Sequence, residues 1–302
     1  MTDSLDIRKA ADVLRRGGLV AFPTETVYGL GADADNDQAL QAIFRVKGRP
    51  ETHPLIVHLA GVGQLKDWTA SIPDSAWKLG ERFWPGPLTL ILKKASRVSK
   101  VVTGGQETVG LRVPDHPAAL SLLREFGGGV AAPSANRFGK VSPTTAEHVR
   151  QDLGSDVDYV LDGGPCSIGV ESTIVDFSSG DPVILRPGGL TRERLEEALG
   201  RPVLVKGAGP VRVSGQLESH YAPRAEVLIV RPGEGEGRAG ELRSKGRKVL
   251  VLSEKDVEAR ELYASLRRAD GSGADVIIVA LPDTVGLGLA VADRLQKAAA
   301  RR

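Results

Sequence analysis

Two cations stand close together where an expected helix ends and a proline follows. Lys47 and Arg49 lie in the segment RVKGRP, residues 45–50. A turn that holds two cations together suits a polyphosphate, and arginine can bind phosphate oxygens through two parallel hydrogen bonds. Cations are also common at helix C-termini, where they complement the helix dipole. The segment therefore suggests a phosphate site, with a solvated helix end as the alternative.

Further polar clusters adjoin apolar strand patterns elsewhere in the chain. They are FPTETVYGLG (22–31), VGLRVP (109–114), AAPSANRFGKVSPT (131–144), GVESTIVD (169–176) and ILRPG (184–188). Polar groups at strand ends face the crevice where open α/β sheets bind ligands. Arg112 alternates with apolar neighbours and needs an anionic partner, either a ligand carboxylate or an acidic residue of the fold. Together these clusters predict one cavity rimmed by loops, although each alone also suits a helix cap or turn.

The elements that must position these clusters alternate between strand and helix patterns. Apolar runs predict strands at 19–22, 55–59, 88–92, 108–113, 130–132, 159–161, 173–177 and 183–185. Helical spacing predicts helices at 7–14, 36–46, 73–83, 116–126, 144–153 and 191–199, with residue 144 as an N-cap. The order is irregular, which indicates an α/β fold that is not a simple βαβ repeat.

A segment rich in glycine and proline, residues 206–224, predicts a linker between two domains. We expect a first domain over residues 1–205 and a second over 225–302. Apolar runs at 226–230, 248–253 and 274–281 and a closing helix at 286–299 predict a small parallel sheet with right-handed crossovers.

Composition excludes several classes of protein. The chain has 302 residues with 40 Lys and Arg against 38 Asp and Glu, so overall charge gives no reason to expect strong nucleic-acid binding. A single cysteine, Cys166, excludes an internal disulfide and a cysteine-built metal site. No apolar run is long enough for a membrane span, and the N-terminus lacks a signal-peptide core. These observations favour a cytoplasmic protein without membrane contact.

The ordered set of motifs resembles the threonylcarbamoyl-AMP synthase family in its two-domain form. The matching segments are PTETVYGLG, KGR with Pro50, FWPGPLT, SAN, ESTIVD, LRPG and SHYAPR. The resemblance implies a YrdC-type α/β catalytic domain with a twisted mixed sheet and a large cavity. It also implies a small Rossmann-like parallel α/β domain, joined by a linker that folds over the cavity.

The resemblance further implies a nucleotidyltransferase reaction. L-threonine, bicarbonate or CO2, and ATP would give threonylcarbamoyl-AMP and pyrophosphate with the help of Mg2+. Its expected partners are these small molecules and a downstream tRNA threonylcarbamoyl transferase, with a weak contact to tRNA itself. Such an adenylation depends on fixed cations and hydrogen-bond donors and needs no covalent nucleophile.

The family pattern also implies roles for individual residues, with no protein ligand to a metal. The expected catalytic residues are Lys47 and Arg49. Those expected on the ATP side are Arg49, His53, Thr108, Ser134, Asn136, Ser142, Arg186, His220 and Tyr221. Those expected on the threonine side are Thr26, His58, Arg112, the Ala132 backbone and Ser172. His53 departs from the pattern, since relatives commonly carry Asn or Lys there.

Two other functions are alternatives to this one. A non-catalytic RNA-binding module with a basic cavity is the main alternative, but near-neutral charge and 4% aromatic residues argue against it. Carbamoyl transfer in hydrogenase maturation uses a related domain together with zinc-finger and acylphosphatase modules. A chain with one cysteine and this length has no room for them.

Overall fold

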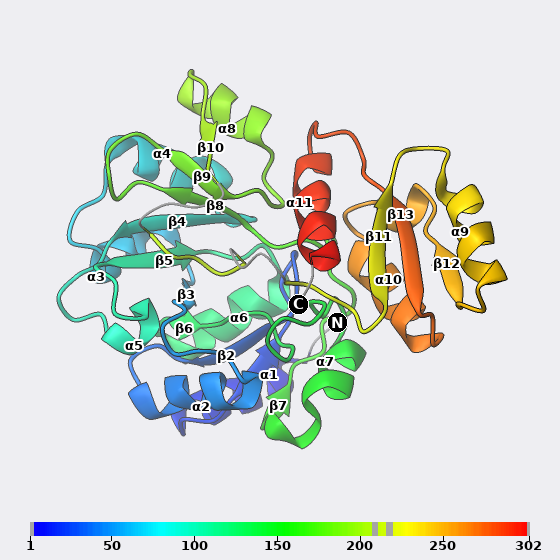
Figure 1. The fold of residues 1–302 in the computed structure, drawn as a ribbon. Helices are drawn as coiled ribbons and strands as arrows, with labels where there is room; N and C mark the ends of the chain where they lie inside the picture. The colour runs from blue at the N-terminus through cyan, green and yellow to red at the C-terminus, as the bar shows by residue number, and fades with distance from the viewer. Residues whose placement is uncertain (1–2, 207–210, 216–219, 301–302) are drawn as a thin grey trace.

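The computed structural model describes residues 3–206, 211–215 and 220–300, which form two sheets and the helices around them (Figure 1). The larger sheet has the strand order β10-β9-β8-β4-β5-β3-β6-β2-β1-β7, and the smaller has the order β11-β13-β12. Both parallel and antiparallel pairs occur in the larger sheet. The prediction of a mixed-sheet α/β domain beside a smaller α/β domain is confirmed.

The bounds of the elements follow the predicted pattern with additions. The strands are β1 (Val20–Phe22), β2 (Gly29–Asp33), β3 (Ile56–His58), β4 (Leu88–Lys93), β5 (Thr108–Arg112), β6 (Val130–Ala131), β7 (Tyr159–Val160), β8 (Thr173–Asp176), β9 (Val183–Arg186), β10 (Leu204–Val205), β11 (Glu226–Val230), β12 (Val249–Val251) and β13 (Val276–Ala280). The α-helices are α1 (Ser4–Arg15), α2 (Asp37–Lys47), α3 (Leu65–Trp68), α4 (Asp74–Phe83), α5 (Lys100–Thr103), α6 (Pro117–Phe126), α7 (Ala146–Leu153), α8 (Arg192–Leu199), α9 (Gly235–Ser244), α10 (Leu262–Gly271) and α11 (Gly288–Ala299).

Helix caps explain where the phosphate-site candidates fall. Asn36 caps α2 by accepting hydrogen bonds from the backbone N–H groups of Gln38 and Ala39. The helix ends at Gly48, whose φ of 63° is left-handed and suits glycine. Lys47 is therefore the last helical residue, and Arg49 follows the turn.

The N-cap of α7 differs from the predicted one by a residue. Thr145, not Thr144, accepts the capping hydrogen bond from the His148 N–H. The two adjacent threonines have the same chemistry, so the sequence could not choose between them.

The glycine-rich segment after the PTETVY motif is a strand, although glycines are usually turn residues. β2 pairs with β1 and β6, and a Cβ on Gly31 would lie 2.8 Å from side-chain carbons of both Phe22 and Val130. Glycine is needed there because the two flanking side chains fill the space.

The smaller sheet is parallel throughout, as predicted. Figure 1 shows α11 between this sheet and the larger domain. A hydrophobic cluster joins the two parts, since Val27, Val141 and Val170 pack with Tyr263 and Leu295. Among the described residues, no helix is long and apolar enough to cross a membrane.

Candidate active site

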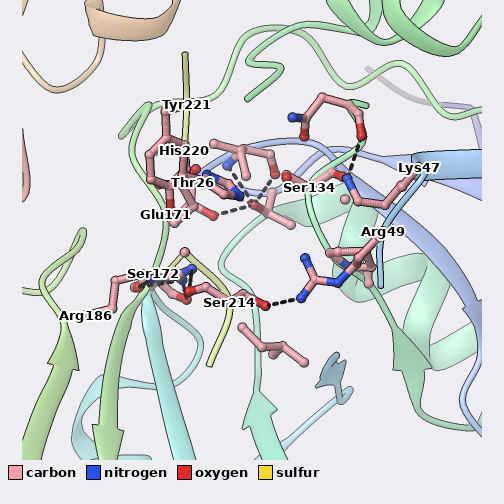
Figure 2. A pocket seen from close by; sticks show the side chains of 18 of the residues that line it. Thr26, Lys47, Arg49, Ser134, Glu171, Ser172, Arg186, Ser214, His220 and Tyr221 are labelled. Carbon is pink, nitrogen blue, oxygen red and sulfur yellow. Dashed lines mark hydrogen bonds between the residues drawn. The ribbon is translucent and has the colours of Figure 1, made fainter. Parts of the chain in front are cut away.

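A polar cavity opens where the ends of the larger sheet's strands meet the linker (Figure 2). Its space, counted with the opening to solvent, is about 630 Å³. It is lined by Thr24, Thr26, Val27, Gly29, Lys47, Arg49, Ile56, His58, Arg112, Ala132, Pro133, Ser134, Asn136, Phe138, Gly139, Glu171, Ser172, Arg186, Ser214, Gly215, His220 and Tyr221. The structure therefore brings together all but three of the predicted site residues.

Lys47 and Arg49 form one wall of the cavity, and both are buried. Lys47 Nζ donates to the backbone oxygens of Ser134 and Asn136, each at 2.5 Å. Arg49 Nη2 donates to the carbonyl of Pro54 and to Ser214 Oγ, each at 3.0 Å. Burial lowers the pKa of Arg49 to about 10, and burial together with Arg49 lowers that of Lys47. The solvated-helix-end alternative is therefore wrong for these two cations.

Arg186, at the end of β9, contributes another cation to the same cavity. Its guanidinium donates to the backbone oxygen and the hydroxyl of Ser172, at 2.9 and 3.1 Å from Nη2. Nη1 donates to the backbone oxygen of Ser214 at 3.0 Å. Ser214 thus accepts hydrogen bonds from both Arg49 and Arg186, which places two guanidinium groups around one short segment of the linker.

His58 and Arg112 stand next to each other because β3 and β5 are parallel neighbours in register. Burial and the neighbouring Arg112 lower the pKa of His58 to about 3, so the imidazole is neutral at physiological pH. Arg112 Nη2 lies 2.7 Å from Glu25 Oε1. However, neither of these atoms has hydrogen-bond geometry to a described group.

Three predicted residues do not line the cavity. Ser142 is fully buried and donates to Glu171 at 2.7 Å. Thr108 lines a smaller neighbouring pocket that shares Ser214 with the main cavity. His53 contacts the ring of Phe138, a lining residue, at 5.4 Å between centroids.

The sequence did not single out Glu171, Phe138 or Ser214 as site residues. Glu171 stands in the ESTIVD motif and Phe138 in the loop after SAN, so both lie within the polar clusters predicted to rim the cavity. Ser214 had no such signal. Its role depends on contacts with residues far away in the chain, which periodicity and spacing do not show.

The lining side chains give the cavity a positive electrostatic character. Lys47, Arg49, Arg112 and Arg186 face it, against the carboxylate of Glu171. Within the described residues, no group of three or more His, Cys, Asp or Glu could hold a metal ion. The arrangement is suited to binding anions.

Two family models match consecutive parts of the chain. The model described as telomere recombination matches residues 12–188, and that described as threonylcarbamoyl-AMP synthase, C-terminal domain, matches residues 190–300. A threonylcarbamoyl-AMP synthase of Bacillus subtilis is 44% identical, covering 100% of this chain and 95% of the relative. One of Pyrococcus abyssi is 42% identical, covering 98% and 94%.

Solved structures agree with these matches. The crystal structure of Pyrococcus abyssi Sua5 complexed with L-threonine has a TM-score of 0.92 at 42% identity, covering 98% of this chain and 95% of that one. The larger domain also resembles Escherichia coli YciO, with a TM-score of 0.53 at 26% identity over 60% of this chain and 88% of that one. The chain therefore belongs to the threonylcarbamoyl-AMP synthase family of nucleotidyltransferase-type enzymes.

Proposed function

We propose that the cavity converts L-threonine, bicarbonate or CO2, and ATP into threonylcarbamoyl-AMP and pyrophosphate. In this proposal Lys47, Arg49 and Arg186 bind the triphosphate, with Ser134, Asn136, His220 and Tyr221 around the nucleotide. Thr26, His58, Arg112, the Ala132 backbone and Ser172 hold the threonine. His53, Thr108 and Ser142 stay predictions for the ATP side, acting from positions beside the cavity lining.

One observation supports this proposal more than any other: buried donors of two separate arginines lack hydrogen-bond partners in the described protein. They are Arg49 Nε and Arg112 Nε, both of residues that line the cavity, whereas Arg112 Nη2 lies 2.7 Å from Glu25 Oε1. Buried polar atoms are nearly always partnered, so such atoms in a cavity indicate a ligand. Two guanidinium groups fit two anions, a polyphosphate and an amino-acid carboxylate.

The reaction follows from this placement. The threonine amine attacks bicarbonate, and loss of water gives an N-carboxylate. That carboxylate attacks the α-phosphorus of ATP, and the bond to the β-phosphate oxygen breaks to release pyrophosphate. Fixed cations stabilise the charge that develops on the phosphate oxygens. Neutral His58, with an unpartnered Nδ1, can accept a hydrogen bond from the threonine amine.

In this proposal Mg2+ binds together with ATP. Among the described residues, no cluster of acidic or histidine side chains could hold a metal ion, so the proposal assigns Mg2+ to the ATP phosphates. Mg2+ commonly binds through substrate phosphates and retains several waters. When bound it would neutralise phosphate charge beside the cavity cations.

The wider setting is also proposed. A separate tRNA threonylcarbamoyl transferase would take the product in the cytoplasm, and this chain itself would contact tRNA weakly at most.

The domain bounds stay as predicted, namely 1–205, a linker over 206–224, and 225–302. Pairing of β10 with β9 and the start of β11 at Glu226 support these bounds. Residues 207–210 and 216–219 of that linker lie outside the described residues.

A pyrophosphate-release assay tests the function. The full chain with ATP, L-threonine and bicarbonate should release pyrophosphate, and omission of any one substrate should stop the release. Mass spectrometry should detect threonylcarbamoyl-AMP in the complete mixture. Absence of both products, together with tight RNA binding, would favour the non-catalytic RNA-binding alternative.

A further inference from the structure

Arg294 on α11 is fully buried, although it belongs to the smaller domain. A buried arginine needs partners of opposite charge. Its Nε donates to Glu171 Oε2 at 2.8 Å, and its Nη1 donates to Asp293 Oδ2 at 2.5 Å. The guanidinium also lies over the ring of Tyr221, 5.1 Å from the centroid. Both Glu171 and Tyr221 line the cavity, so Arg294 contacts the site from behind its wall.

Glu171 collects hydrogen bonds from both domains. Besides Arg294, it accepts from Ser142 Oγ at 2.7 Å and from the Tyr263 hydroxyl at 2.8 Å. Burial alone would raise the pKa of Glu171, but Arg294, Arg186 and the hydrogen bond from Ser142 bring it down to about 2. The carboxylate is therefore ionised and fixed in place, which makes it unsuited to proton transfer near neutral pH.

Tyr221 is held in an unusual backbone conformation. Among the described residues it is the one non-glycine residue with a positive φ, which is 60°. This backbone conformation is unfavourable for a residue with a side chain, so the surrounding contacts must stabilise it. Its buried ring stacks on Tyr263 with centroids 5.8 Å apart and receives the Arg294 guanidinium. The smaller domain thus supplies the contacts that fix this strained residue.

Tyr221 packs against the linker segment that accepts hydrogen bonds from the cavity arginines Arg49 and Arg186. A Cβ on Gly215 would lie 2.3 Å from the Tyr221 hydroxyl, so the two groups are already packed closely. The adjacent Ser214 accepts from Arg49 and from Arg186 (Figure 2). A continuous series of contacts therefore leads from α11 to two cations of the cavity.

We infer that Arg294 is a positioning residue for the synthase reaction, acting through Tyr221 and Ser214 on Arg49 and Arg186, and through Glu171 on the cavity wall. The inference rests on the proposed function, because it assigns those two arginines to ATP. It differs from a plain docking role for the smaller domain. Docking has its own contacts, since Arg267 on α10 pairs with Asp152 on α7, at 3.0 and 2.5 Å, and neither residue lines the cavity.

The test compares Arg294→Met with the matched control Arg267→Met in the full chain. Each removes one arginine that pairs across the domain interface, but only the first contacts the cavity wall. The measurements are the ATP and threonine dissociation constants by calorimetry, kcat for pyrophosphate release, and the urea midpoint. We expect Arg294→Met to weaken ATP binding and lower kcat by about 10- to 100-fold, the effect of a small displacement of catalytic groups.

Threonine affinity should change less in this variant, within about threefold, because Arg112 and His58 receive nothing from Arg294 and only Ser172 is connected to it, through Arg186. Arg267→Met should lower the urea midpoint while ATP affinity and kcat stay within about threefold. Besides Asp152, Arg267 donates to the backbone oxygens of Val141 and Ser142, none of these three residues lines the cavity, and the Ser142 hydroxyl is not contacted. Arg294→Lys keeps the charge without the planar fork and should recover only part of the loss.

Wild-type ATP affinity and kcat in folded Arg294→Met would overturn the inference. Equal losses in Arg267→Met would overturn it too, because docking alone would then explain them. If Arg294→Met does not fold, Arg294→Lys replaces it, because a lysine keeps the charge but cannot reproduce the guanidinium's contacts with Glu171 and the Tyr221 ring. Unchanged ATP affinity and kcat in folded Arg294→Lys would also contradict the inference. Failure of the wild type to release pyrophosphate refutes the proposed function, whereas the ATP affinities still decide the positioning role.

Discussion

At the scale of single residues, the two cations at the end of α2 offer the most direct test of the ATP site. Arg49→Ala and Lys47→Ala should each lower pyrophosphate release by at least about 100-fold, the loss expected for one preorganised charge-stabilising donor. Both cations are buried, whereas Arg45 on the same helix is exposed, so Arg45→Ala is the control. Near-wild-type release from both cavity variants would contradict the ATP assignment.

Arg112 is a second residue whose ligand can be tested. Arg112→Gln should weaken threonine binding by about 10- to 100-fold, because a charged hydrogen bond contributes roughly 1.5–3 kcal/mol. The ATP affinity of this variant should equal that of the wild type. The control is Glu25→Gln, since Glu25 Oε1 lies 2.7 Å from the guanidinium. Unchanged threonine affinity in a folded Arg112→Gln protein would assign this arginine to an internal ion pair, which calorimetric titration decides.

The residue types at strand ends predicted most of the cavity lining, because several polar clusters that each follow or adjoin a strand meet at one crevice of an α/β fold. The contributions of Ser214 and Arg294 could not be predicted in this way. Ser214 accepts from arginines on two distant segments, and Arg294 has the sequence context of an ordinary surface helix. Only the fold reveals such long-range contacts.

At the scale of elements, the caps and apolar spacing predicted the bounds of α2 and α8 to within about a residue, whereas α1 begins three residues before its predicted start. Strand β2 could not be predicted from the sequence, because glycines such as Gly29 and Gly31 are usually turn residues. The reason for glycine there is packing against Phe22 and Val130, two side chains brought near by β1 and β6. Local propensity cannot anticipate that requirement.

Gly31→Ala tests this explanation of β2. The added methyl would meet side-chain carbons at 2.8 Å inside the sheet, so the free energy of unfolding should fall by roughly 1–3 kcal/mol through overpacking. Gly61→Ala is the control, because nothing lies within 4 Å of its Cβ and its φ of −175° is extended. Urea unfolding measures both, and equal stability of the two variants would refute the packing argument.

At the scale of the whole molecule, the small parallel sheet was predictable, but the way it meets the larger sheet and its helices was not. Figure 1 places α11 against the larger domain, and its buried face carries Arg294. Helical spacing marked α11 as amphipathic without showing that the opposing surface holds a carboxylate. The charged pair between Arg294 and Glu171 is therefore information that only the assembled molecule contains.

The ion pair between Arg294 and Glu171 should make the stability of the protein depend on pH. The pKa of Glu171 is about 2 in the folded chain against 4.5 as its ordinary value, with Arg294, Arg186, Ser142 and Tyr263 around it. A depressed carboxyl pKa adds stability that is fully present above about pH 4.5 and is lost as the pH falls toward 2. The contribution is at most roughly 3 kcal/mol, from 1.36 kcal/mol per pKa unit.

Glu171→Gln isolates this contribution above about pH 3. Buried His58 and His220 have folded pKa values of about 3, and their protonation in the unfolded chain also lowers stability as the pH falls below 6.5. Glu171 raises the pKa of His220, so the His220 contribution differs between the two proteins only near pH 3 and below and cancels above it. The gap in unfolding free energy between wild type and variant should be constant from pH 7 to about 5 and shrink below 4.5. A gap that does not change down to pH 3, measured by urea unfolding, would mean that Glu171 and Arg294 do not form the interdomain ion pair in solution.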